Sequence, residues 1–190
     1  MTYKYDIRDY MKLYSDFASD KECKDTIKLL KKNNWSKHSY VDANRENVRT
    51  QYENDLSITI GEGEFFDEQN NRIWNYIHDY ILNHINQPTL DCWHGYTRIR
   101  YNRYNKGEEM RNHVDHISSI FDGHTKGIPF LTVLGSLNDN YEGGKLLFFN
   151  DIEVPMPTGS IIIFPSIFIY PHLVTPVTKG TRYSFVSWIW

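Results

Sequence analysis

From residue 93 to the C-terminus, hydrophobic residues recur at every second position in short segments separated by turn residues. This period is that of β-strands whose two faces differ, and turns such as Asn105-Lys106-Gly107 and Pro157-Thr158-Gly159 divide them. The pattern predicts eight strands, at residues 96–104, 112–117, 130–137, 145–149, 152–154, 160–164, 169–174 and 182–190. Eight short strands in succession favour two sheets packed face to face.

The first half of the chain has a different pattern. Cys23, Ile27 and Leu30 recur at helical spacing after Ser19-Asp20, a typical helix start, and predict a helix over residues 21–32. Similar spacing predicts a helix over 72–86, and alternation predicts a short strand at 56–60. We therefore expect an α+β fold in one domain, residues 1–190. A helical N-terminal portion, about 17–90, would pack against a double-stranded β-helix (jelly-roll) core, about 93–190.

Composition and charge exclude several classes of protein. Hydrophobic residues make up 40% of the chain and aromatic residues 15%, which argues against disorder. The net charge of −3 gives no electrostatic reason to expect nucleic acid as a partner. The N-terminus lacks the apolar segment of a secretory signal and no apolar run is long enough to span a bilayer, so we expect a cytoplasmic protein without membrane contact. Cys23 and Cys92 fit no metal-site spacing and indicate reduced thiols.

His113 and Asp115 form the motif around which we expect the chemistry to be arranged. On a strand, residues two apart share a face, so an imidazole and a carboxylate would converge there. These are two of the three ligands of a facial triad, which suits non-haem Fe(II) and leaves positions open. His172, on a late apolar strand, is the candidate third ligand. A lone histidine in such a place is more often a hydrogen-bonded core residue.

Two further residues have a simple structural reading and a functional one. Arg182 opens the apolar terminal strand, and a charge there is either exposed at the strand end or paired, for example with a carboxylate held by both guanidinium nitrogens. Tyr104 precedes the turn before His113 and, taken alone, is a tyrosine at a strand end.

Taken together and in order, these motifs resemble those of the 2-oxoglutarate/Fe(II)-dependent dioxygenases, and within them the prolyl 4-hydroxylase branch. The resemblance covers most of the chain and is specific from about residue 96 onward; it is looser before that, at Trp35 and Arg49-Thr50. The motifs that carry it are Tyr104-x-x-Gly107, His113-x-Asp115, Gly143-Gly144-Lys145-Leu146, Pro171-His172-x-Val174 and Gly180-x-Arg182-Tyr183-Ser184.

The resemblance implies a role for each of these residues. His113, Asp115 and His172 would ligate Fe(II), Arg182 would pair with the distal carboxylate of 2-oxoglutarate, and the Tyr104 hydroxyl would donate a hydrogen bond to it. The implied cofactors are Fe(II), 2-oxoglutarate and dioxygen, with ascorbate as a supporting factor. Hydroxylation would release succinate and carbon dioxide.

The substrate is the part that the resemblance leaves open. A prolyl residue in a peptide or protein is the first expectation, and Trp188 is either near that substrate or packed in the core. Met110 replaces a frequent aromatic residue, and Ile128-Pro129-Phe130 stands where an arginine often helps to hold the peptide. Gly180-Thr181-Arg182-Tyr183 also resembles procollagen lysyl hydroxylases, so a lysyl or other small substrate is an alternative. Trp188 stands where nucleic-acid demethylases carry a second arginine, which speaks against nucleic acid.

Two rival classes of protein use the same scaffold: a non-catalytic jelly-roll binding module, and a cupin-type isomerase or zinc-binding relative. The second usually has more histidine ligands, for which His116 and His124 are candidates, although His116 would face away on a strand. His78 and His84 read as surface or core-edge residues. Residues 34–55 read as a long connection, and with 118–127 they are candidates to close over the substrate. The small chain suggests a microbial or viral source, and its oligomeric state stays open.

Overall fold

A computed structural model describes residues 6–41, 49–87, 89–90, 95–116 and 128–190. Its largest element is a seven-stranded sheet in which every neighbouring pair is antiparallel. In spatial order its strands are β1 (Lys12–Tyr14), β12 (Ile161–Pro165), β8 (Leu131–Ser136), β15 (Arg182–Ile189), β6 (Arg100–Tyr104), β5 (Ser57–Ile60) and β2 (Ser36–Lys37).

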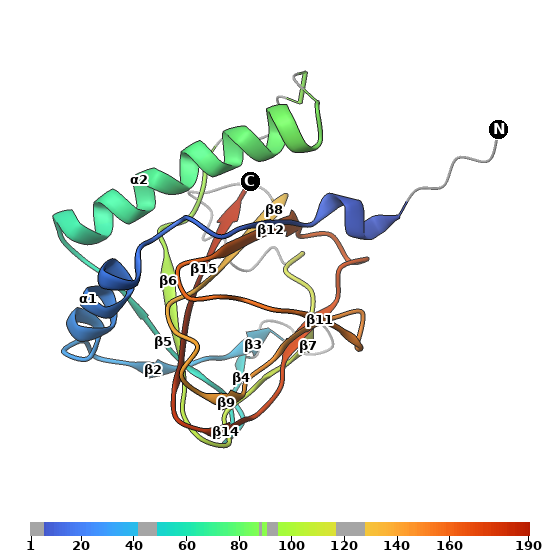
Figure 1. Ribbon diagram of the computed structural model, residues 1–190. Coiled ribbons are helices and arrows are strands. Elements are labelled where there is room, and N and C mark those ends of the chain that lie inside the picture. Colours follow the sequence, from blue (N-terminus) through green and yellow to red (C-terminus); the bar gives the residue numbers. More distant parts are fainter. Residues whose placement is uncertain (1–5, 42–48, 88, 91–94, 117–127) are drawn as a thin grey trace.

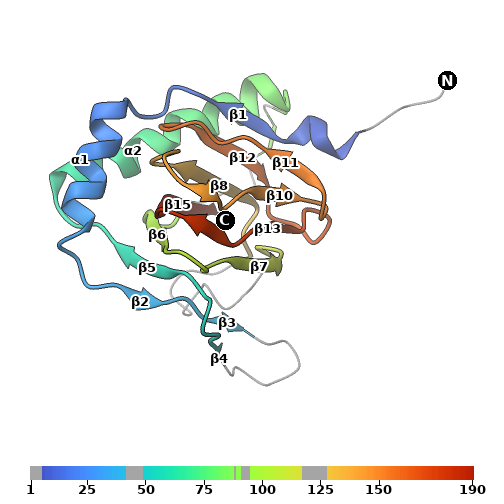
Figure 2. The same ribbon diagram turned by 60° about the horizontal axis from the view of Figure 1, so that its bottom comes forward.

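A four-stranded antiparallel sheet faces one side of this large sheet (Figure 2). Its order is β11 (Ile152–Val154), β10 (Leu146–Phe148), β13 (His172–Val174) and β7 (Met110–His113). Phe148 and Val174 of the small sheet share one buried cluster with Ile162 and Phe164 of the large sheet. Two short ribbons complete the strands: β14 (Val177–Lys179) with β9 (Glu142–Gly143), and β3 (Tyr40–Val41) with β4 (Arg49–Thr50).

The helices cover the other side of the large sheet (Figure 1). After a short 3-10 helix, η1 (Ile7–Tyr10), come α1 (Asp20–Leu30) and α2 (Glu64–Asp79), which continues as a π-helix, η2 (Tyr80–His84). Leu30 and Ile77 of these helices lie in one buried cluster with Tyr101 and Phe185 of the sheet. The expected α+β architecture with N-terminal helices packed on a sheet is therefore confirmed. Among the described residues, we find no helix with the length and hydropathy required to span a bilayer.

Several expected boundaries were wrong. The strand expected at 112–117 is β7, which ends at His113, and the strands expected at 96–104 and 169–174 begin only at Arg100 and His172. The helix expected over 72–86 begins at Glu64. Its first turns carry polar residues that are buried, Gln69 and Asn70, so hydrophobic spacing does not mark them.

The segment 34–55 contains strands and is not a structureless connection. It forms β2, β3 and β4, so the N-terminal portion, 17–90, is only partly helical. The strands β1, β9 and β14 were also not expected. Cys23 is a buried free thiol, and burial raises its pKa to about 11. The expectations for Cys92, His124 and the segment 118–127 lie outside the described residues.

Candidate active site

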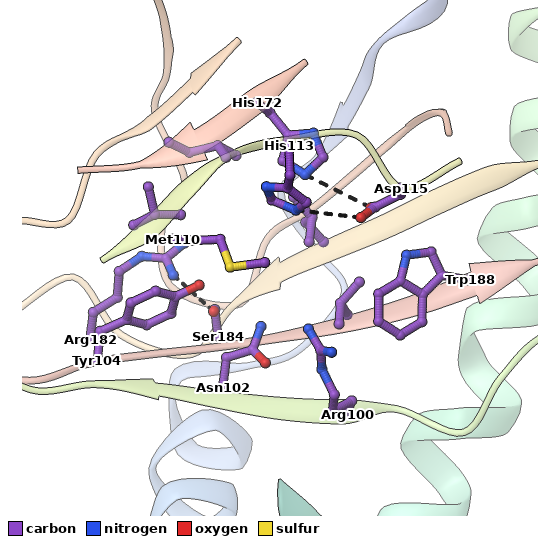
Figure 3. Close-up of a pocket in the computed structure, with 14 residues that line it drawn as sticks. Arg100, Asn102, Tyr104, Met110, His113, Asp115, His172, Arg182, Ser184 and Trp188 are labelled. Atoms are coloured by element: carbon purple, nitrogen blue, oxygen red, sulfur yellow. Dashed lines mark hydrogen bonds and ion pairs between the residues drawn. The ribbon is translucent and has the colours of Figure 1, made fainter. Parts of the chain in front are cut away.

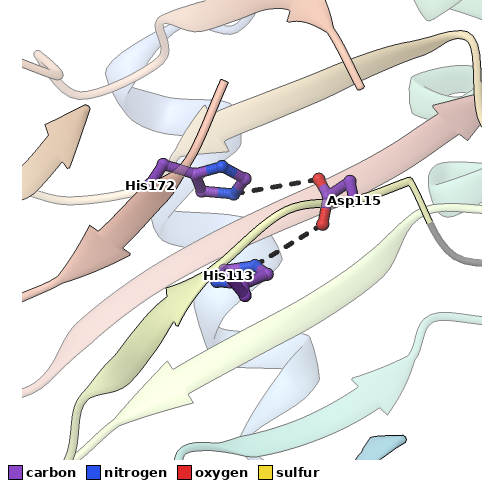
Figure 4. Close-up of side chains that lie close together, drawn as sticks. All are labelled: His113, Asp115 and His172. Atoms are coloured by element: carbon purple, nitrogen blue, oxygen red, sulfur yellow. Dashed lines mark ion pairs between the residues drawn. The ribbon is translucent and has the colours of Figure 1, made fainter. Parts of the chain in front are cut away.

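Two side chains from neighbouring strands of the small sheet, and a third from the segment after one of them, form a cluster that could hold a metal ion. One ligand atom each of His113, Asp115 and His172 lies within 4.8 Å of the others. His113 and His172 are paired residues of β7 and β13, and Asp115 follows β7. Asp115 Oδ1 lies 3.5 Å from His113 Nε2, and its Oδ2 lies 3.8 Å from His172 Nε2 (Figure 4).

Contacts behind the three side chains fix which atoms face the centre of the cluster. His113 Nδ1 lies 2.8 Å from the Arg111 carbonyl oxygen, and His172 Nδ1 lies 3.1 Å from that of Tyr170. A carbonyl accepts from Nδ1–H, which leaves the lone pair of each Nε2 free for a metal. The Thr132 hydroxyl donates to Asp115 Oδ2 at 2.8 Å and so orients the carboxylate.

The electrostatics of the cluster favour the protonation states that a metal requires. Burial by itself would raise the pKa of Asp115, but its interactions with His113 and His172 hold it well below the usual range. Burial lowers the pKa of His172 to about 4, and the nearby His113 adds to this. At neutral pH the cluster therefore contains an ionised carboxylate and a neutral His172 imidazole. Two imidazole nitrogens and one carboxylate oxygen are the donor set of a facial triad for Fe(II).

The cluster opens into a pocket between the two sheets (Figure 3). Alternate residues of β15 and β6 form its floor, because residues two apart on a strand share a face. On β15 these are Arg182, Ser184, Val186 and Trp188; on β6 they are Arg100, Asn102 and Tyr104.

Arg182 lies at one end of this pocket and is nearly fully buried, with 4% of its surface exposed. Its guanidinium stacks on the Tyr104 ring, with Cζ 4.9 Å from the ring centre, and Nη1 donates to Ser184 Oγ at 2.8 Å. Among the described residues Nε has no hydrogen-bond partner, and no carboxylate pairs with the guanidinium. A buried guanidinium with an unused donor fits the carboxylate of a bound ligand. Tyr104 is also buried, and its ring is directly beside that guanidinium.

The structure brings five expected residues, His113, Asp115, His172, Arg182 and Tyr104, to one pocket, and Trp188 lines it as well. It does not bring His116, His78 or His84 there. His116 is exposed, and His78 and His84 lie on α2 and η2, on the far side of the large sheet.

Sequence reasoning missed four polar residues of the site. Arg100, Asn102 and Ser184 share the pocket face of their strands, and Thr132 contacts Asp115 from β8. The alternation on residues 96–104 would have placed Arg100 and Asn102 on the same face as Tyr104. Met110 also lines the pocket, and its sulfur accepts a hydrogen bond from the Tyr40 hydroxyl at 3.2 Å.

Comparison with known proteins finds a family that the second half of the chain resembles. Residues 99–190 match the family described as the 2OG-Fe(II) oxygenase superfamily. A PKHD-type hydroxylase of Idiomarina loihiensis is 35% identical over 95 residues, which cover 48% of this chain and 41% of that protein. One from Aliarcobacter butzleri is 37% identical over 97 residues, covering 47% and 41%. The chain thus matches about two fifths of the length of these curated relatives.

Solved structures show the same fold over nearly the whole chain. A prolyl hydroxylase from Trichoplax adhaerens, in complex with a hypoxia inducible factor peptide, has a TM-score of 0.71 at 20% identity and covers 96% of this chain and 84% of that one. The viral collagen prolyl hydroxylase of Paramecium Bursaria Chlorella virus-1 has a TM-score of 0.64 at 18% identity, covering 95% and 94%. Residues 99–190 thus resemble the 2OG-Fe(II) oxygenase superfamily, a family that uses Fe(II), 2-oxoglutarate and dioxygen, and the cluster of His113, Asp115 and His172 could hold the iron.

Proposed function

We propose that this protein is an Fe(II)- and 2-oxoglutarate-dependent dioxygenase that hydroxylates a residue, with proline as the first candidate, in a peptide or protein. In this reaction a C–H bond, 2-oxoglutarate and dioxygen give C–OH, succinate and carbon dioxide. One observation carries the proposal: a cluster with the donor set for Fe(II) and a buried arginine with an unused donor line the same pocket. The proposal treats residues 1–190 as one domain with a double-stranded β-helix core.

The geometry of the pocket supports a role for each of these residues. His113, Asp115 and His172 would hold the iron, and Arg182 would bind the distal carboxylate of 2-oxoglutarate beside the Tyr104 hydroxyl. Iron, when bound, supplies the redox chemistry that brings oxygen to a C–H bond. The protein's own contribution is to orient both ligands and to exclude water. The buried side chains of Leu146 and Val174, which also line the pocket, serve the second purpose.

Support for a peptidyl target comes from the relatives. The solved structures that share this fold include prolyl hydroxylases, one of them bound to a peptide, and the curated relatives are PKHD-type hydroxylases. Trp188 and Met110 line the pocket near the proposed iron ligands, where a substrate side chain would enter. A lysyl residue is the alternative target.

The test is an anaerobic titration of Fe(II) and 2-oxoglutarate into the protein, followed by the weak visible charge-transfer band of their chelate. We expect a band, and on admission of oxygen we expect succinate together with a peptide that has gained one oxygen atom. Proline- and lysine-containing peptides, tested side by side, identify the target. A folded protein that gives no band would refute the dioxygenase and favour the binding module.

A further inference from the structure

The pocket contains a second arginine that the proposed roles do not use. Arg100 lies on β6, four residues before Tyr104, and its side chain points into the pocket toward Asp115 (Figure 3). Its Cζ lies 4.8 Å from the ring centre of Trp188. Nε is buried and has no hydrogen-bond partner among the described residues, within which no carboxylate forms an ion pair with Arg100.

The surroundings of Arg100 do not neutralise it. Burial lowers the pKa of Arg100, and the charge of Asp115 opposes that effect. Asp115, however, accepts a hydrogen bond from the Thr132 hydroxyl and belongs to the cluster that would hold the metal ion. His38, which also faces this region, is buried, and burial holds its pKa at about 3, so it is neutral at pH 7 and adds no second positive charge; an imidazole supplies no negative charge in any case. A partly buried guanidinium without a partner carries a desolvation cost that no contact among the described residues offsets.

Arg100 lies at the opposite end of the pocket floor from Arg182. Arg182 pairs with Tyr104 across the two strands, whereas Arg100 pairs with Val186. Four residues of strand between Tyr104 and Arg100 correspond to about 13 Å. A five-carbon diacid bound at Arg182 is too short to cover that distance. Arg100 is therefore free to contact a different molecule, at the end where Trp188 stands.

The charges of the loaded pocket favour an anion there. The two arginines and Asp115 line it, and Fe(II) and the 2-oxoglutarate dianion cancel each other in formal charge. One positive charge then remains uncompensated, and a single carboxylate would neutralise it at short range in a poorly solvated site.

We propose that Arg100 is a specificity-determining residue that binds a carboxylate of the substrate. The preferred substrate is then a peptide with an acidic side chain, or with the C-terminal carboxylate, next to the hydroxylated residue. This inference rests on the proposed function and defines its substrate class. Arg100 would use its free Nε and neighbouring nitrogens for this contact while its flat face stays on Trp188.

The test is calorimetric binding of matched peptides to the protein loaded with Fe(II) and 2-oxoglutarate without oxygen. One set is acetyl-Gly-Xaa-Pro-Gly-amide with Asp, Asn or Lys as Xaa; a second is acetyl-Gly-Asn-Pro as the free acid and as the amide. We expect an acid to bind about 10-fold or more tightly than its amide, as for one charge-paired contact. A preference within the first set indicates recognition of a side-chain carboxylate, and a preference within the second set indicates recognition of the C-terminal carboxylate.

Variants then assign the preference to Arg100. Arg100→Met should remove it without changing 2-oxoglutarate affinity, and Arg100→Glu should favour the Lys peptide. Arg103→Met is the matched control, because Arg103 is on the same strand, faces away from the pocket and stacks on Trp35 with Cζ 4.5 Å from the ring centre. It should keep the preference. Arg100→Gln replaces Arg100→Met if the latter does not fold.

Two results would overturn the inference. The first is a wild-type protein that binds the acid peptide and its amide with equal affinity, or binds neither. The second is a preference for the acid peptide that persists in Arg100→Met. The second would make Arg100 only a structural partner of Trp188. The chelate band, recorded on the same samples, separates this failure from that of the proposed function. If the wild type gives no band, the proposed binding of iron and 2-oxoglutarate fails, whatever the role of Arg100.

Discussion

His113 and His172 stand opposite each other on the antiparallel strands β7 and β13, with their ring centres 4.3 Å apart. The two imidazoles therefore reach the cluster through one strand pairing, and Asp115 closes it from the segment that follows β7. The geometry of the proposed iron site thus depends on a contact between segments that are distant in the sequence.

Removing one imidazole is expected to abolish iron binding. His172→Ala leaves one nitrogen and one carboxylate as ligands. Loss of a residue that only hydrogen-bonds to a metal ligand typically lowers metal affinity about 10- to 100-fold, and we expect a larger loss of Fe(II) affinity here. The chelate band should be absent from anaerobic titrations, with the far-ultraviolet circular dichroism unchanged. The exposed His116 provides the control, because His116→Ala should keep the band. A full band in His172→Ala would place the iron elsewhere.

The hydroxyl of Thr132 is expected to tune the metal site. It donates to Asp115 Oδ2 at 2.8 Å, so Thr132→Val should lower Fe(II) affinity about 10- to 100-fold while the shape of the side chain is kept. Competition with a fluorescent metal chelator measures the change. Thr26→Val is the control, since Thr26 is equally buried but bonds to Glu22 and Gln69 on the helical side. Equal affinities in both variants would contradict a role for this contact.

Arg182 is expected to determine the affinity for 2-oxoglutarate. Loss of its guanidinium removes a desolvated charge pair, worth about 2–5 kcal/mol, so Arg182→Met should weaken 2-oxoglutarate binding by about 100-fold or more. Anaerobic calorimetry in the presence of Fe(II) measures it. Arg103→Met should bind as the wild type does, because Arg103 pairs with Tyr183 on the opposite face of the same strands. A wild-type affinity in Arg182→Met would assign the co-substrate to another cation.

His38 is expected to make the fold sensitive to acid. Burial holds its pKa at about 3, whereas an unfolded histidine titrates near 6.5. The unfolded state therefore binds the proton first, and stability falls as the pH drops from about 6.5 towards 3. Between pH 7 and pH 5 this single group should cost about 2 kcal/mol of unfolding free energy. Urea unfolding of His38→Gln should show a correspondingly smaller loss; equal losses in both proteins would contradict the prediction.

The α+β architecture and the pair His113 and Asp115 were accessible from the sequence because their signals are local, whereas His172 was proposed from the family resemblance. Period-two alternation predicts strands, and the His-x-Asp spacing of His113 and Asp115 points to two ligands of a triad. The reasoning about His113 and Asp115 was nevertheless wrong in one detail. They were expected to share a strand face, but β7 ends at His113 and Asp115 lies in the bend beyond it.

The features that the sequence did not predict depend on contacts that only the folded chain establishes. The strand β1 has three residues and is defined by its pairing with Ile161–Ile163 of β12. Arg100 and Asn102 were not recognised because polar residues on a strand are usually assigned to solvent. Their position in the pocket follows from the pairing of β6 with β15, which sequence periodicity does not specify.

The strand β15 is buried on both faces and pairs with β6 on one side and β8 on the other. Its even-numbered residues, such as Arg182 and Trp188, face the pocket, whereas Tyr183 and Phe185 pack in the core beneath the helices. Insertion or deletion of one residue would exchange these two sets. Relatives of this protein should therefore differ by replacement within β15, and changes of length should be confined to the turns on either side.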